Sequence, residues 1–176
     1  MLISICLGLA AFAAFSLFEF VRAGSLRTGS RYNIWFAVGL TLLTAMWVLI
    51  IIRGFRGIDV QFISGILIAA ATVVWYVKLL AVAGKGNYTA DKGSSEVNTE
   101  GIYGMCRHPG FYAFIILSGA LALAAGTVEG VVCAALTVVL NSAYIIVQDV
   151  YWFRIYINGY EEYRKKVPFL GFRIRK

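Results

Sequence analysis

The chain has 176 residues, which fits a single domain, residues 1–176, better than two. Hydrophobic residues make up 60% and charged residues 14%, whereas a soluble domain is typically about 45–50% apolar and about 25% charged; we therefore expect an integral membrane protein in contact with the lipid bilayer. The net charge of +7 comes with no basic helix or nucleic-acid-binding motif, so we expect no nucleic-acid partner and assign the charge to the membrane surface.

Five apolar stretches approach the roughly 20 residues that a membrane-crossing helix needs. They cover about residues 2–21, 34–52, 61–84, 109–126 and 130–148. Inside lipid each segment must satisfy its own backbone hydrogen bonds, so we expect helices rather than open strands. The first stretch lacks a basic segment before it, and we interpret it as a retained helix rather than a cleaved signal. The sequence thus predicts an all-α, polytopic membrane protein with five transmembrane helices.

The fourth and fifth stretches are separated only by Thr127-Val128-Glu129, which predicts an antiparallel helical hairpin. Small residues are frequent along it, and small residues let helices approach closely in membranes. We expect these residues of the fourth helix to face Ala134, Ala135 or their neighbours: Ala113, Gly119, Ala120, Ala122, Ala124, Ala125 and Gly126.

The distribution of basic residues predicts the orientation in the membrane. Thirteen of the sixteen Lys and Arg residues lie in the first loop, the third loop and the C-terminal segment, and only Arg53 and Arg56 lie in loops on the other side. By the positive-inside rule, the side with thirteen is cytoplasmic. We therefore expect the N-terminus outside and the C-terminus in the cytoplasm.

The segment after the fifth stretch, about residues 149–166, is aromatic and basic. Its aromatic residues recur at spacings of three and four: Trp152, Tyr156, Tyr160 and Tyr163. This spacing gives one amphipathic face, which predicts a C-terminal helix lying at the membrane interface. Gly159 weakens that helix by about 1 kcal/mol relative to alanine.

Metal and disulfide chemistry are not indicated. The three cysteines, Cys6, Cys106 and Cys133, form no CxxC pair, and the chain has one histidine. We predict neither a disulfide framework nor a metal site.

The one histidine, His108, stands between Arg107 and Pro109, where the fourth helix is expected to begin. Proline suits the first helical turn, and a helix N-terminus favours anions. Arg107 and His108 could therefore bind a carboxylate or phosphate, or they could be a positive-inside charge and a lipid headgroup contact. Because of the hairpin, Asp149 returns to the same end, where it could form a salt bridge or complete a site for a zwitterion.

Two linked motifs carry a family resemblance. Gly101, Tyr103, Arg107, His108 and Pro109 fit G-x-Y-x-x-x-R-H-P, and residues 160–168 fit Y-x-x-Y-x-x-x-V-P. From about Asn98 to Pro168 the chain resembles the isoprenylcysteine carboxyl methyltransferase and phospholipid methyltransferase superfamily. It departs from that pattern at four positions, Phe111 for Tyr, Ala113 for Gly, Gln148 for Glu and Ile157 for Gly.

The resemblance implies a site for S-adenosylmethionine at the cytoplasmic membrane face. Arg107 and His108 would hold the carboxylate of the cofactor and act in catalysis, and Asp149 would accept from its ammonium group. Pro109 starts the helix that forms the site. The tyrosines would stack on adenine or face the sulfonium: Tyr103, Tyr156, Tyr160 and Tyr163. The methyl acceptor would be lipid-linked or apolar, such as a prenylcysteine carboxylate, a phospholipid amine or a thiol.

Two other functions fit parts of the pattern. Sterol-type membrane reductases have a similar R-H-P-x-Y helix pair and bind NADPH, although they are usually longer. A non-catalytic membrane protein of the same fold is favoured by the altered motif positions and disfavoured, as a transporter, by the scarcity of charge within the spans. The oligomeric state is not fixed by any sequence feature.

Overall fold

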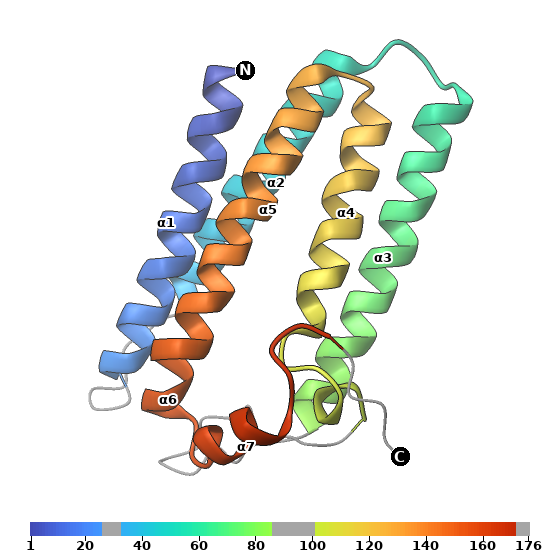
Figure 1. Ribbon diagram of the computed structural model, residues 1–176. Helices are drawn as coiled ribbons and strands as arrows, with labels where there is room; N and C mark the ends of the chain where they lie inside the picture. The colour runs from blue at the N-terminus through green and yellow to red at the C-terminus, as the bar shows by residue number, and fades with distance from the viewer. Residues whose placement is uncertain (26–32, 86–100, 172–176) are drawn as a thin grey trace.

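The computed structural model describes residues 1–25, 33–85 and 101–171, and this part of the chain is helical without any strand (Figure 1). The long helices are α1 (Leu2–Ser25), α2 (Asn33–Gly54), α3 (Val60–Lys85), α4 (Pro109–Ala125) and α5 (Val128–Val147). The short elements are the 3₁₀ turn η1 (Gly101–Gly104), the π-helical turn η2 (Gln148–Trp152), α6 (Phe153–Tyr156) and α7 (Tyr160–Lys166). The predicted all-α class is confirmed.

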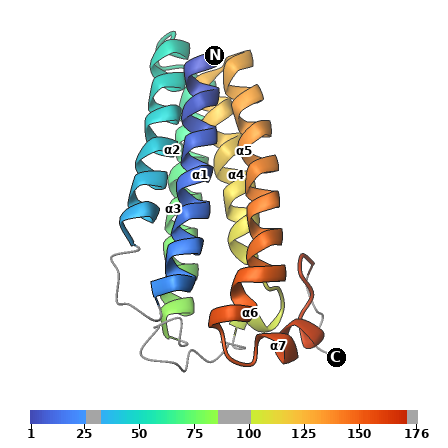
Figure 2. The same ribbon diagram turned by 90° about the vertical axis from the view of Figure 1, so that its left-hand side faces the viewer.

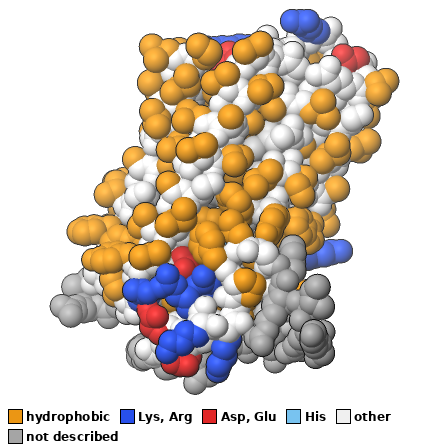
Figure 3. Space-filling model, viewed as in Figure 1, with side chains coloured by type: hydrophobic (Ala, Val, Ile, Leu, Met, Phe, Trp, Pro, Cys, Tyr) orange, Lys and Arg blue, Asp and Glu red, His pale blue; other side chains and the backbone are white. Residues whose placement is uncertain are grey.

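Four of the apolar helical segments are long enough to cross a membrane: Leu2–Gly24, Asn33–Gly54, Val60–Leu79 and Val128–Ile155. The fourth predicted stretch forms a shorter apolar helix, α4, of 17 residues. Large apolar side chains cover the outside of the bundle, for example Ile52 at 68% and Leu67 at 65% exposure, and charged side chains lie at its two ends, with the larger group at the lower end (Figure 3). A hydrocarbon environment accounts for such a surface, because water would make it costly.

Helix α4 lies between its neighbours: α3 packs along one side and α5 along another, while α1 packs against α2 and α5 (Figures 1 and 2). Glycine permits the closest approach. A Cβ added to Gly65 of α3 would lie 2.5 Å from the backbone nitrogen of Ala124. The expectation that the small residues of α4 face α5 is therefore only partly right. Ala122 and Ala125 contact Gly130 of α5, whereas Ala120 and Ala124 contact Gly65 of α3.

The hairpin between α4 and α5 is closed by standard capping. Gly126 ends α4 in the left-handed region, with φ +61°, and Thr127 accepts a hydrogen bond from the backbone N–H of Gly130 at 3.1 Å. The two helices therefore run antiparallel, as predicted. The start of α4 and the end of α5 consequently meet at the same end of the bundle, which we call the Asp149 end.

The segment beyond α5 differs from the single amphipathic helix predicted for residues 149–166. It breaks between α6 and α7, where Gly159 has φ +76°, a value that glycine adopts without strain. Because of this break, α7 folds back onto the bundle. Tyr160 and Tyr163 are 2% and 4% exposed and pack with Ile157 and Val167, so these two members of the predicted aromatic face lie inside the protein.

Candidate functional site

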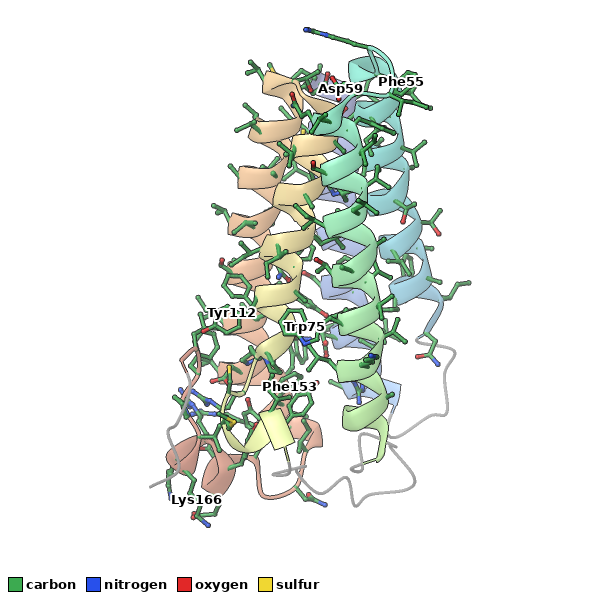
Figure 4. All side chains as sticks on the ribbon, turned by 90° about the vertical axis from the view of Figure 1, so that its right-hand side faces the viewer. Phe55, Asp59, Trp75, Tyr112, Phe153 and Lys166 are labelled. Carbon is green, nitrogen blue, oxygen red and sulfur yellow. The ribbon has the colours of Figure 1, made fainter. Side chains whose placement is uncertain are left out.

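A buried carboxylate lies at the centre of the Asp149 end. Asp149 is in η2 and is 2% exposed, and His108, the residue before α4, is 7% exposed. Phe153 and Lys166 lie at this end in Figure 4, while Phe55 and Asp59 lie at the other. The prediction that the hairpin returns Asp149 to Arg107 and His108 is confirmed by direct contacts.

Asp149 accepts hydrogen bonds from three side chains and forms an ion pair with a fourth, Arg164. Nη1 of Arg107 lies 2.9 Å and Nε of Arg164 lies 3.3 Å from Oδ2. Nε2 of His108 lies 3.1 Å from Oδ1, and the Tyr160 hydroxyl donates to the same oxygen at 2.5 Å. We call these five residues the Asp149 cluster. A carboxylate beside two guanidinium groups is an acceptor only, so Nε2 of His108 carries the proton that faces it.

The cluster is held together by elements far apart in sequence. Arg107 and His108 precede α4, Asp149 follows α5, and Tyr160 and Arg164 belong to α7. The side chains of Arg107 and Asp149 are 8% and 3% exposed, so water does little to screen their attraction. Removal of one partner from such a pair typically costs about 3–5 kcal/mol, because a buried charge is left uncompensated.

The residues after α7 cover the cluster. We call residues 167–171 the C-terminal strap. Its backbone carbonyl at Pro168 accepts from the N–H of Arg107 at 3.1 Å, and the Phe169 ring lies 4.9 Å from the His108 ring and 5.5 Å from the Arg107 guanidinium. The N–H of Gly171 donates to the hydroxyl of Tyr112 at 2.9 Å. The strap therefore closes the side of the cluster that would otherwise face away from the bundle.

The strap also touches Cys106, the residue before Arg107. The Cys106 thiol is fully buried and lies 3.6 Å from the carbonyl oxygen of Phe169. Burial raises the pKa of the Cys106 thiol, and nearby backbone N–H groups and Arg107 offset this only in part. The thiol is therefore held in its unreactive protonated form.

The π-helical turn sets the direction of Asp149. The N–H of Phe153 bonds to the carbonyl of Gln148, a spacing of five residues instead of the usual four. Such turns insert one residue into a helix and often occur at functional sites. The inserted residue changes the rotation of the chain just where Asp149 must point at α4.

A second buried carboxylate lies on α1, and the sequence analysis did not assign it a role. Glu19 is 1% exposed, and its Oε1 accepts from the Tyr144 hydroxyl at 2.9 Å and from Nε2 of Gln148 at 2.5 Å. A charged residue within an apolar stretch was the available signal, because such residues are costly and usually functional.

The other predicted site residues take several positions. Pro109 is buried at the start of α4. The Tyr163 hydroxyl donates to the backbone carbonyl of Tyr103 at 2.7 Å, so these two tyrosines connect α7 to η1. The side chain of Tyr156 lies outside the described residues. Sequence reasoning missed Arg164 and Phe169 as members of the site, because only their basic and apolar character was visible.

The main interactions within the cluster are ion pairs between Asp149 and the guanidinium groups of Arg107 and Arg164. The cation and the acid predicted to bind opposite ends of a zwitterion are bonded to each other, and Nε of Arg107 is buried without a hydrogen-bond partner in the described part of the chain. That nitrogen is a remaining donor for an anion. Among the described residues no group of three His, Cys, Asp or Glu side chains could hold a metal ion.

The sequence matches no protein-family model, no curated protein and no solved structure.

Proposed function

We propose that the chain is an S-adenosylmethionine-dependent membrane methyltransferase acting on a lipid-linked or apolar acceptor. The observation that carries the proposal is that Arg107 and His108 of the first motif meet Asp149, which lies 42 and 41 residues further along the chain, in one buried cluster. In this proposal α4 is the fifth membrane-crossing helix. The Asp149 end faces the cytoplasm, as the basic residues predict.

The donor set suits an amino-acid zwitterion. Arg107 would exchange Asp149 for the carboxylate of the cofactor, and Asp149 would accept from its ammonium group. One buried ion pair would thus become two, with no change in net charge. The free-energy cost of removing Arg107 and Asp149 from water has already been met on folding, so cofactor binding would not add it again. The unpartnered Nε of Arg107 supports this exchange, because Nε and Nη together form the planar fork that fits a carboxylate.

The transfer of the methyl group itself would need no covalent intermediate with the protein. The cofactor, when bound, would supply an electrophilic methyl group. The chain would hold the acceptor in line and exclude water from the reacting groups, which accounts for much of the rate in such transfers. An amine acceptor must also lose a proton, and His108 and Asp149 are the groups of the cluster that could take it.

Asp149 already has three hydrogen-bond donors and an ion pair with Arg164 within the protein, which favours a second candidate, a non-catalytic protein in which the cluster only holds α4, α5 and α7 together. The two candidates differ in whether any ligand can separate Arg107 from Asp149.

Methyl transfer tests the proposal directly. Purified protein in lipid nanodiscs is incubated with methyl-labelled S-adenosylmethionine and either phosphatidylethanolamine or a prenylcysteine. We expect label in one acceptor and none with Arg107→Ala. Arg154→Ala is the matched control, because Arg154 is an arginine at the same end whose partner, Glu161, is exposed. No transfer to either acceptor and no cofactor binding would contradict the proposal, and binding of NADPH instead would point to a reductase.

A further inference from the structure

Glu19 is the buried charge that the proposed mechanism does not use. It reaches α5 from a position 125 residues away from Tyr144 and 129 away from Gln148. Both side chains donate to the same oxygen of Glu19, Oε1. Glu19 therefore makes more than a general helix contact, because it binds two particular side chains, Tyr144 of α5 and Gln148 of η2.

Tyr144 lies five residues before Asp149, and Gln148 lies directly before it. Tyr144 and Gln148 are four residues apart, so they share the face of α5 that meets α1. Gln148 is also the first residue of η2, and its backbone carbonyl accepts the bond that closes the π-helical turn. Its side chain is thus bound by Glu19 while its main chain sets the turn that carries Asp149.

Asp149 follows Gln148 and is directed roughly a quarter of a turn further around the helix. Because both faces belong to one continuous helical segment, the angle about the helix axis between the residues bound by Glu19 and Asp149 is fixed. If the first face turned, the Asp149 oxygens would leave Arg107 and His108, which hydrogen-bond to them at 2.9 Å and 3.1 Å.

We infer that Glu19 is a positioning residue: by binding Gln148 and Tyr144 it sets the rotation of η2 that presents Asp149 to Arg107 and His108. The inference concerns the geometry of the cluster. Only its consequence for cofactor binding rests on the proposed function.

His108 gives a direct readout because it is the one histidine in the chain. Protein labelled with ¹⁵N and ¹³C in histidine shows one set of ring resonances, measured in nanodiscs without any cofactor. Asp149→Asn defines the position of these resonances when the carboxylate is lost. We expect Glu19→Leu and Gln148→Glu to move them toward that position, the second because it opposes two carboxylates.

The double variant Glu19→Gln/Gln148→Glu keeps one carboxylate and one amide in the pair with their places exchanged. We expect it to return the His108 resonances toward wild type. Glu129→Gln, at the other end of α5, is the matched control and should leave them unchanged. If Glu19→Leu does not fold, Gln148→Leu provides the same comparison, since it leaves the bond from Tyr144 to Glu19 in place.

The inference is overturned if the folded Glu19 and Gln148 variants keep wild-type His108 resonances, or if the exchanged pair is no closer to wild type than Gln148→Glu alone. A residue that only docks α1 on α5 would lower the unfolding temperature without moving His108. If the wild-type protein also binds S-adenosylmethionine, Glu19→Leu should weaken that binding about tenfold. If the wild-type protein does not bind it, the proposed function fails while the His108 result still decides the role of Glu19.

Discussion

The two ends of α5 carry similar ionic clusters in different surroundings. At its start, Glu129 accepts from the Ser4 hydroxyl at 2.6 Å, the amino group of Met1 at 2.9 Å and Arg53 at 3.3 Å. Just beyond its end, Asp149 accepts hydrogen bonds from Arg107, His108 and Tyr160 and forms an ion pair with Arg164. The Glu129 side chain is 19% exposed and its two cationic partners are more exposed still, whereas Asp149 is 3% exposed.

The two clusters make similar numbers of contacts and differ in burial. We therefore use burial to distinguish a structural ion-pair cluster, at Glu129, from a candidate ligand site, at Asp149. Water and salt screen the Glu129 cluster, so its partners can be exchanged at small cost. Within the Asp149 cluster the side chains of Arg107, His108 and Asp149 are desolvated, so the charges of Arg107 and Asp149 require each other. Buried charge networks of this kind occur at binding sites and also as structural ion pairs, and the proposed function takes the Asp149 cluster as a binding site.

The largest effect is expected for Asp149→Ala. This change leaves Arg107 and Arg164 facing each other in a buried site, and we expect it to destabilise the protein by about 3–5 kcal/mol. Thermal unfolding in a mild detergent, followed by helical circular dichroism, measures the loss. An effect as small as that of Glu129→Gln would remove the distinction between the two ends.

Arg107→Lys should have the next largest effect. A lysine keeps the charge but loses the planar fork and the contact of the guanidinium with the Phe169 ring. We expect a loss of about 1.5–3 kcal/mol, the typical worth of a hydrogen bond to a charged group. Arg53→Lys at the Glu129 end is the matched control and should cost less than 1 kcal/mol on the scale of about 0–1 kcal/mol for exposed pairs.

Cys106 reports whether the strap stays closed. Because its raised pKa keeps the thiol protonated, its thiolate fraction at pH 8 is below that of an ordinary cysteine, and we expect slow alkylation that accelerates as the pH rises. Phe169→Ala removes the ring over the cluster and should speed the reaction several-fold. The rate is measured with a maleimide in a Cys6→Ser/Cys133→Ser background. Equal rates with and without the Phe169 ring would show that the strap does not shield this end.

The smallest effect is expected for Glu129→Gln. Its ion pairs are partly exposed, so we expect a loss of about 1 kcal/mol or less that shrinks further when salt is raised from 0.05 to about 0.5 M. Unfolding of the wild type and the variant at both salt concentrations measures it. A large loss that does not depend on salt would place this cluster in the same class as the Asp149 cluster.

Sequence reasoning predicted the helices and the hairpin because both depend on local composition. Apolar length predicts a helix in lipid, and three residues between two helices force them to run antiparallel. From this alone, Asp149 could be brought to the end that holds His108. Their position at one end of the bundle followed from topology, whereas the contact between the two side chains also depends on the π-helical turn that directs Asp149.

The rest depends on tertiary structure. No composition signal marks the π-helical turn at Gln148, since it arises where one extra residue is accommodated between the α1 and α4 contacts. The break at Gly159 was visible as a weak point, but the burial of Tyr160 depends on Asp149 as its acceptor. Glu19 could be found as an acid in an apolar stretch, whereas its partners on α5 could not.

The central claim is that the Asp149 cluster is a ligand site and the Glu129 cluster is not. Titration calorimetry of S-adenosylmethionine into wild type, Asp149→Asn and Glu129→Gln tests it with two nearly isosteric changes at the two ends of α5. We predict binding by the wild type, unchanged affinity in Glu129→Gln, and a loss of at least about tenfold in Asp149→Asn, as expected for the loss of a buried charged acceptor. Equal affinity in all three proteins, or no binding by the wild type, would contradict the account.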